Sequence, residues 1–105
     1  MSNQQFSVKD NSRVRIRPPR KYDVVFHNDD FTTMDFVIQV LKDVFLKSEI
    51  DAFSLMMDVH KSGKAIVGSY SYDIAMSKRD KAMALASAEG FPLKITVEEQ
   101  PELPF

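Results

Sequence analysis

The sequence contains no cysteine, and its three glycines are isolated from one another. The absence of cysteine excludes disulfide bonds and zinc–thiolate sites, and it fits a reducing cytosol. A phosphate-binding loop needs clustered glycines, so none is predicted. No apolar run approaches the roughly 20 residues of a membrane-spanning helix. The polar stretch at residues 1–5 lacks the apolar core of a signal peptide. We therefore expect a cytoplasmic protein with no membrane partner.

The net charge of −1 conceals two regions of opposite sign. Residues 1–21 carry six basic side chains and one acidic side chain, a net of +5, whereas residues 22–105 carry 8 basic and 14 acidic side chains, a net of −6. An acidic domain argues against nucleic acid as a partner. Residues 1–20 are polar and then basic, and Pro18-Pro19 interrupts regular structure, so we expect a flexible extension. Val14 and Ile16 alternate with arginines there, which leaves a short strand as an alternative.

The hydrophobic pattern predicts three strands in one small domain. With 44% hydrophobic residues, a chain of 105 residues can bury a single core. Lys21–His27 and Lys64–Tyr70 are rich in β-branched and aromatic residues. In Leu93–Glu98 apolar and polar residues alternate, as in a half-buried strand.

Three helices are predicted from helical periodicity and from residues that favour helix ends. They should run over residues 33–47, 49–62 and 72–88, with Thr32, Ser48 and Ser71 as N-caps. Gly63 and Gly90 should end the second and third helices. The order β-α-α-β-α-β predicts an α+β two-layer sandwich, in which the helices cover one face of a three-stranded sheet. Residues 100–105 are expected to fray.

Polar side chains gather where the first strand should end and the first helix should begin. Asn28, Asp29 and Asp30 stand side by side at this junction, where loops often present functional groups. If the junction faces the end of the second helix, they form a rim with His60. The residues that would form an apolar floor beneath it are Met34, Val37, Met56 and Val59. An ammonium group has three donors, and an amide oxygen, a carboxylate and a neutral imidazole supply three acceptors. The pattern therefore suits a ligand with a cation beside a hydrophobic group.

Each of these residues also has a purely structural explanation. Asn-Asp-Asp is common turn chemistry, and a histidine at a helix C-terminus interacts favourably with the helix dipole. A metal site built from His27, Asp29, Asp30 and His60 matches no known spacing of ligands. The serines lack the context of a catalytic triad, so we do not expect an enzyme.

Two motifs in the sequence carry a resemblance to a known family. The first is Asn28-Asp29-Asp30-Phe31-Thr32-x-Met34-Asp35-Phe36-Val37, and the second is Met56-x-x-Val59-His60-x-x-Gly63-Lys64-Ala65. Together they resemble the ClpS family of adaptor proteins in bacterial N-degron (N-end rule) degradation. The resemblance covers residues 21–99. It implies one adaptor domain there, with a three-stranded antiparallel sheet and three helices.

The resemblance also implies a function. Family members are not enzymes; they bind proteins whose first residue is Phe, Tyr, Trp or Leu. They deliver these substrates to a ClpA-type AAA+ unfoldase for degradation by ClpP. No cofactor and no metal are implied, and we expect a monomer. The alternative is a general protein-interaction module or a Clp ATPase regulator without N-terminal-residue specificity, and a metal-dependent hydrolase comes third.

Family positions imply roles for individual residues. Asn28, Asp30 and His60 would bind the substrate's α-ammonium group, with Asp29 near the first peptide group. The residues implied to line the side-chain pocket are Thr32, Met34, Val37, Met56, Val59 and Leu93. Met34 would be the gatekeeper that disfavours β-branched Ile and Val, because a branch at Cβ widens the ligand where packing is tightest. Asp73 and Lys78 would contact the ATPase, and so would the N-terminal extension.

Three residues depart from the family pattern. Thr33 replaces a usual Pro at what we expect to be the first helical position, where the cost should be small. His27 replaces an apolar residue and is expected to border the pocket, which leaves the preference among Leu and the aromatic residues open. Phe31 in place of Tyr loses one hydroxyl and should be neutral.

Overall fold

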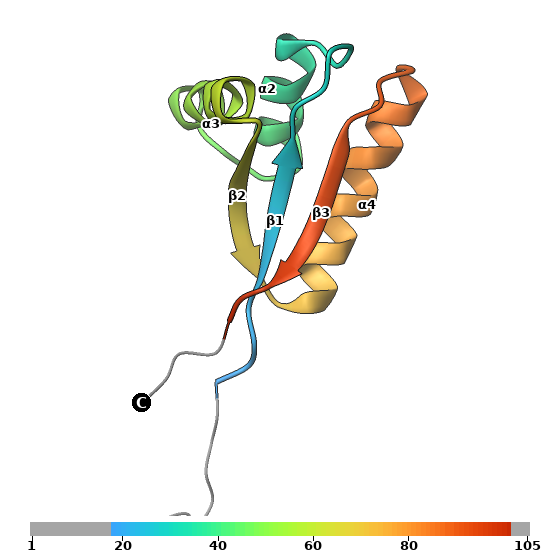
Figure 1. Cartoon of the computed structure of the whole chain (residues 1–105). Helices are drawn as coiled ribbons and strands as arrows, with labels where there is room; N and C mark the ends of the chain where they lie inside the picture. The colour runs from blue at the N-terminus through green and yellow to red at the C-terminus, as the bar shows by residue number, and fades with distance from the viewer. Residues whose placement is uncertain (1–17, 102–105) are drawn as a thin grey trace, which may run out of the picture.

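The structure is a computed structural model in which residues 18–101 are described. The elements, in order, are β1 Tyr22–His27, α2 Met34–Asp43, α3 Glu49–Ser62, β2 Lys64–Tyr70, α4 Tyr72–Ala88 and β3 Lys94–Glu99 (Figure 1). The predicted order β-α-α-β-α-β is therefore confirmed. The expected flexible extension, residues 1–20, lies outside the described residues except for 18–20, and it stays a prediction. Gln100, which we placed in the tail, donates its backbone N–H to Lys21 O at 2.9 Å.

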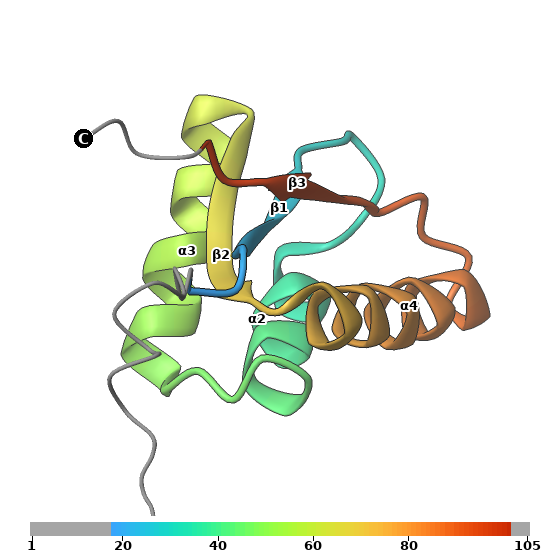
Figure 2. The same ribbon diagram turned by 90° about the horizontal axis from the view of Figure 1, so that it is seen from below.

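The sheet has the strand order β2-β1-β3, and both pairs are antiparallel. The first strand of the sequence is thus the central one. Val24 and Phe26 of β1 are fully buried. Because side chains alternate along a strand, these two face the helices, and Asp23, Val25 and His27 face the other way. Figure 2 shows α2 and α4 on one side of the sheet and α3 alongside β2. The helices cover one face only, as predicted.

The core lies between this covered face and the helices. Phe26 packs edge-on against Phe45, with ring centroids 5.4 Å apart. Helix α4 contributes small buried side chains at Ala75, Ala82 and Ala86. Small residues allow the helix backbone to approach the sheet closely, so α4 packs against the strands along its length.

Helix α2 begins one residue later than predicted. Thr33, and not Thr32, is its N-cap, and the Thr33 side chain accepts a hydrogen bond from Phe36 N at 3.2 Å. The prediction of Thr32 was wrong because the Thr32 hydroxyl is used elsewhere: it donates to Asp29 Oδ2 at 2.8 Å. The prediction that Thr33 is the first helical residue was wrong for the same reason. Threonine at this cap makes a hydrogen bond that proline could not.

Helix α2 also ends earlier than predicted, at Asp43 rather than Lys47. Leu46 has a φ of 57°, in the left-handed region, which no α-helix can continue through. Lys78 from α4 donates to the carbonyl of Val44, the C-cap residue, at 2.8 Å. A cation at this position satisfies a free carbonyl and favours the negative end of the helix dipole.

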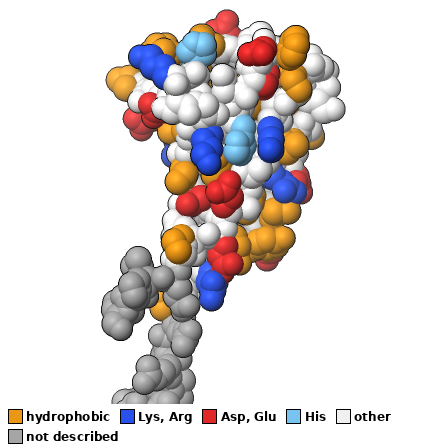
Figure 3. Space-filling model, in the orientation of Figure 1, with side chains coloured by type: hydrophobic (Ala, Val, Ile, Leu, Met, Phe, Trp, Pro, Cys, Tyr) orange, Lys and Arg blue, Asp and Glu red, His pale blue; other side chains and the backbone are white. Residues whose placement is uncertain are grey.

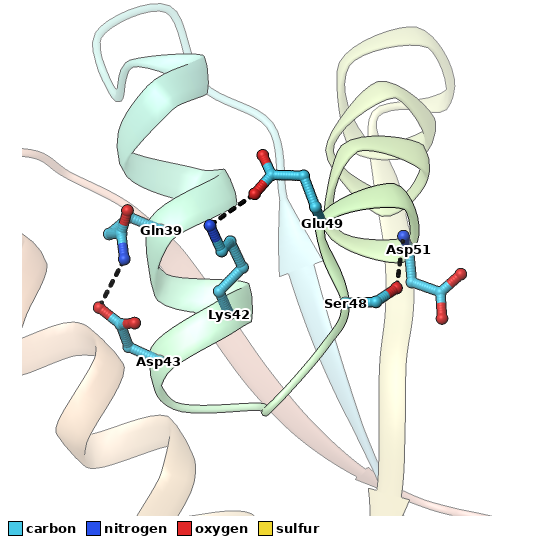
Figure 4. A network of polar contacts seen from close by, with 6 residues as sticks. All are labelled: Gln39, Lys42, Asp43, Ser48, Glu49 and Asp51. Atoms are coloured by element: carbon cyan, nitrogen blue, oxygen red, sulfur yellow. Dashed lines mark hydrogen bonds and ion pairs between the residues drawn. The ribbon is translucent and has the colours of Figure 1, made fainter.

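Polar contacts fix the short connection between α2 and α3 (Figure 4). Lys42 donates to Glu49 Oε1 at 2.6 Å, which joins the two helices directly. Ser48 caps α3 as predicted, because its side chain accepts from Asp51 N at 3.1 Å. The entry angle of α3 is therefore set by its own cap and by one ion pair to α2.

Candidate functional site

A cavity of about 280 Å³ lies between the β1–α2 turn and helix α3. Five of its lining residues are polar: Asn28, Asp29, Asp30, Thr32 and His60. Four are apolar: Met34, Val37, Met56 and Val59. The two sequence motifs, far apart along the chain, thus meet around one cavity. Of the residues predicted for the rim and the pocket, all but Leu93 line it.

A backbone hydrogen bond ties the two halves of the cavity together. Helix α3 ends at Gly63, whose φ of 89° is left-handed, and the Gly63 N–H donates to Val59 O at 2.9 Å. The carbonyl of the same glycine accepts from Asn28 N at 2.8 Å. The end of α3, which carries His60, is therefore attached to the first residue of the turn.

Asp29 organises the turn rather than pointing into free solvent. Its Oδ1 accepts from the backbone N–H groups of Phe31 at 2.8 Å and Thr32 at 2.6 Å. Its Oδ2 accepts from the Thr32 hydroxyl at 2.8 Å. Partial burial acts to raise the pKa of Asp29, but the hydrogen bonds from Thr32 and Phe31 outweigh it and lower the pKa below its usual value. Asp29 is thus held ionised, with both oxygens occupied.

The other three polar rim residues have unoccupied side chains. Asn28, Asp30 and His60 are all exposed. Within residues 18–101, none of their side chains forms a hydrogen bond or an ion pair. An amide oxygen, a carboxylate and an imidazole nitrogen are therefore available as acceptors at the mouth of one cavity. This set suits a small cation with several N–H donors.

The floor of the cavity is apolar and rigid. Val37, Met56 and Val59 are buried in the hydrophobic core, so their positions are fixed by packing on the far side. Met34, in contrast, is 44% exposed at the first position of α2. A flexible, half-exposed side chain over a rigid floor can control what enters the cavity.

Two predicted neighbours of the pocket lie elsewhere. Leu93 is 4% exposed, belongs to the hydrophobic core and does not line the cavity. His27 points to the uncovered face of the sheet, where its Nε2 lies 2.8 Å from Thr96 Oγ1. The expectation that His27 borders the pocket was wrong, because strand alternation turns its side chain away from the helices. The same orientation separates it from the other residues of the alternative metal site.

The two residues predicted to contact the ATPase are on α4 and not at the cavity. Asp73 is exposed in the first turn of that helix. Lys78 is half-buried: besides its bond to Val44 O, its Nζ lies 5.8 Å from the ring centroid of Phe45 and 5.5 Å from that of Tyr70. Lys78 therefore has a structural role, which its sequence position on a predicted surface helix did not reveal.

Sequence reasoning missed two contributions to this site. It treated Gly63 as a helix stop, and its carbonyl also anchors Asn28. It placed Asp29 near the ligand, and Asp29 also shapes the turn through its contacts with Phe31 and Thr32. The spacing Asp29-x-x-Thr32 was a signal for such a turn, because a carboxylate commonly accepts from groups two and three residues ahead.

Neither a metal cluster nor a membrane span is found in the part of the chain that the structure describes. In residues 18–101, no three His, Asp or Glu side chains lie close enough to share a metal ion. None of the helices there is both long and apolar enough to cross a bilayer.

Comparisons with known proteins identify relatives along most of the chain. The family model of ATP-dependent Clp protease adaptor protein ClpS matches residues 17–96. A protein of that name from Acetivibrio thermocellus is 44% identical over 93 residues, 89% of this chain and 94% of its own length. Another, from Oleidesulfovibrio alaskensis, is 41% identical over 103 residues, 94% of this chain and 99% of its own length.

A solved structure has the same fold. Agrobacterium tumefaciens ClpS2 bound to L-phenylalaninamide superposes with a TM-score of 0.77 at 41% sequence identity. The match covers 79% of this chain and 100% of that one.

Proposed function

The chain belongs to the ClpS family of Clp protease adaptor proteins, and from this premise we propose that it recognises proteins by their first residue. It binds N-terminal Phe, Tyr, Trp or Leu through the free α-amino group and the apolar cavity. It then delivers these proteins, in the cytoplasm, to a ClpA-type AAA+ unfoldase for degradation by ClpP. The chain itself does no covalent chemistry.

One observation carries the proposal: three free acceptors stand at the mouth of a cavity with an apolar floor. Asn28, Asp30 and His60 supply the acceptors, and Val37 and Met56 are part of the floor. An α-ammonium group beside a hydrophobic side chain matches this combination, and only the first residue of a protein carries both. Asp29 supports the turn and lines the cavity beside these acceptors.

The size of the cavity fits a single residue. Pockets for small molecules typically occupy about 300–1,000 Å³, and this one, at about 280 Å³, lies at the lower limit. The relative from Agrobacterium tumefaciens is bound to L-phenylalaninamide, a ligand with one aromatic side chain and one free amine. We propose that the cavity of this chain holds the same groups.

The expected affinity is in the micromolar range. Burial of an aromatic side chain contributes about 2–3 kcal/mol, and each hydrogen bond to the charged amine about 1.5–3 kcal/mol. Association costs at least about 4 kcal/mol. With three such hydrogen bonds, the upper limit of the resulting range is about −8 kcal/mol, which corresponds to a Kd near 1 μM.

Fluorescence anisotropy with short peptides tests the recognition step. Peptides that begin with Phe or Leu should bind, and N-acetyl-Phe should not, because acetylation removes the charge and adds bulk. Peptides that begin with Ile should bind more weakly than Leu, because a branch at Cβ would clash at Met34. Asn28→Ala and His60→Ala should each weaken binding by about 10-fold to 100-fold, because one hydrogen bond to the amine is lost. Asp58→Ala, on the same helix as His60 but outside the cavity, should not weaken it.

The same measurement separates this function from its alternative. A general interaction module or ATPase regulator would bind free and acetylated Phe peptides equally, and that result would overturn the proposal. Delivery is tested separately, by degradation of a Phe-initiated substrate with purified ClpA-type unfoldase and ClpP.

A further inference from the structure

The face of the sheet that the helices leave uncovered carries a pattern that the proposed function does not use. Alternate residues of β1 point to this face, and so do the residues of β2 and β3 that pair with them. Each strand thus contributes three side chains. We call it the open face: Asp23, Val25, His27, Lys64, Ile66, Ser69, Lys94, Thr96 and Glu98. Val25 is only 3% exposed and yet is not part of the helix-side core. The open face therefore has an apolar centre of its own.

Charge changes sign along the open face from one end to the other. At the end nearer the cavity, His27 lies between its partners Lys64 and Lys94. The next row is Val25 with Ile66 and Thr96, and the last is Asp23 with Ser69 and Glu98. In Figure 3 a histidine stands between two basic side chains, with acidic side chains gathered below. Along the open face, a basic row is thus followed by an apolar row and then by an acidic row.

The apolar centre is hollowed and accessible. A depression of about 240 Å³ is lined by the apolar side chains of Val25, Ala65 and Ile66 and by the charged residues Lys64 and Glu98. Ile66 is 54% exposed. Asp23 accepts hydrogen bonds from Ser69 and Gln100, and Glu98 accepts one from Thr96, but neither carboxylate forms an ion pair within residues 18–101. An exposed isoleucine at a hollow, next to such acidic groups, fits a partner with aliphatic and cationic side chains in alternation.

We propose that the occupant is the chain's own N-terminal segment, residues 13–17. Its sequence, Arg-Val-Arg-Ile-Arg, alternates cations with aliphatic residues. The aliphatic side chains of Val14 and Ile16 match the apolar centre around Ile66, and the three arginines are opposite in charge to Asp23 and Glu98. Residues 1–17 lie outside the described part of the structure, so the open face alone defines where they dock.

The point at which the chain enters the domain favours this occupant. Residues 18–21 lead into β1 at the acidic end of the open face, and there Arg20 already pairs with Glu99 of β3. Arg13 is ten residues from Asp23, and a chain extends at most about 3.6 Å per residue, so the segment is confined to within about 36 Å. The basic row at the far end repels the arginines and keeps the segment over the acidic half.

The open face is too small for a second copy of the chain to be its occupant. Two copies related by a two-fold axis would also set basic against acidic rows. However, three strands about 4.8 Å apart and about 20 Å long present only about 300 Å² per copy, whereas stable dimers bury about 1,200 Å² or more in total. A tethered segment has an effective concentration in the millimolar range, so a small contact suffices.

Paramagnetic relaxation in the full chain tests the proposal, and the absence of cysteine makes a single label straightforward. A nitroxide on Ser12→Cys should broaden the amide signals of Val25, Ile66 and Thr96 and spare those of α3. The triple variant Arg13→Gln, Arg15→Gln, Arg17→Gln should lose this broadening. The charge-matched control Lys47→Gln, Lys61→Gln, Lys81→Gln should keep it. Salt at about 1 M should also remove it, because the Debye length falls to about 3 Å.

Three outcomes would overturn the proposal. The first is the absence of broadening on the open face at low salt. The second is broadening that persists in the arginine triple variant. The third is equal broadening when labelled chains are mixed with isotope-enriched unlabelled ones, which would mean that a second copy is the occupant. Because the readout needs no peptide and no unfoldase, it is independent of substrate recognition.

Discussion

At the scale of single residues, adjacent carboxylates in the turn have separate functions. Asp29 accepts three hydrogen bonds from its own turn, whereas the Asp30 side chain makes none within the described residues. One therefore holds the backbone in shape and the other remains available to a ligand. Their sequence letters are identical, and only the turn geometry distinguishes them.

Replacement of each aspartate by asparagine should separate the two functions. Asp29→Asn loses a charged acceptor inside the turn, which should cost about 0.5–2 kcal/mol of folding stability, as for a lost helix cap. Asp30→Asn should leave stability unchanged and weaken binding of a Phe peptide by about 10-fold to 100-fold, because one charge-assisted hydrogen bond is lost. Urea denaturation and anisotropy measure the two effects. Equal loss of stability in both variants would contradict this assignment.

His27 should make stability depend on pH. Burial and the charge of Lys94 lower the pKa of His27, Glu98 opposes the shift, and Lys64 adds to it. The unfolded chain then takes up a proton more readily than the folded chain. The contribution of His27 to the free energy of unfolding is therefore fully present above the ordinary histidine pKa of about 6.5, and it is lost as pH falls below that value. His27→Gln should therefore flatten the change in unfolding free energy between about pH 7.5 and about pH 5.5. An unchanged slope in the variant would show that His27 does not cause it.

At the scale of elements, the C-terminal end of α3 contributes both to the fold and to the geometry of the candidate site. Gly63 adopts a left-handed φ, and its carbonyl holds Asn28 through the bond between α3 and the turn. A helix stop is usually a local feature. Here it also fixes the distance between the acceptors on the turn and His60.

Gly63→Ala should affect both stability and binding. A left-handed φ costs an L-residue about 1–2 kcal/mol, and relaxation of that strain would move the carbonyl that anchors Asn28. Gly90→Ala is a matched control, because Gly90 has a φ of 77° after α4 and open space around it, as Gly63 has. Both variants should lose similar stability, but only Gly63→Ala should lose affinity for a Phe peptide. Equal affinities would mean that the anchor is not needed.

Most elements could be predicted from the sequence, because their signals are local. Ser48, Gly63 and Gly90 stand where the structure needs a cap or a left-handed residue. The start of α2 was mispredicted, since Thr32 and Thr33 are equally good caps by residue type alone. Asp29 decides between them by engaging Thr32, a contact that the spacing Asp29-x-x-Thr32 allows but does not require.

The site was predictable to the extent that its residues belong to two recognisable motifs. Nine of the predicted residues line one cavity, but the orientation of His27 and the burial of Leu93 depend on strand alternation and core packing. The structural role of Lys78 depends on a carbonyl 34 residues earlier. Contacts of this kind require the assembled fold.

At the scale of the whole molecule, substrate binding and delivery should use different surfaces. The cavity lies between the turn and α3, whereas Asp73 is exposed on α4. Asp73→Ala should slow degradation of a Phe-initiated substrate by ClpA and ClpP without change in peptide affinity or stability. Glu89→Ala, an exposed carboxylate beyond the other end of α4, is the control. An effect of equal size in both would indicate a general charge effect rather than a contact.

Lys78→Ala should behave differently from Asp73→Ala. Lys78 supports the C-terminus of α2, so its loss should lower stability by about 1 kcal/mol, besides any effect on delivery. Thermal unfolding separates the two effects. An unaltered melting temperature would mean that its contact with Val44 contributes little.

The central place of β1 in the sheet has a consequence for how the chain is made. Both neighbours of β1 come later in the sequence, and β3 extends to Glu99. During synthesis β1 leaves the ribosome before both of its partner strands, and one of its edges stays unpaired until β3 has been translated. Such a strand is prone to pair wrongly with other chains in the meantime. We therefore expect the nascent protein to be most vulnerable to aggregation just before β3 emerges.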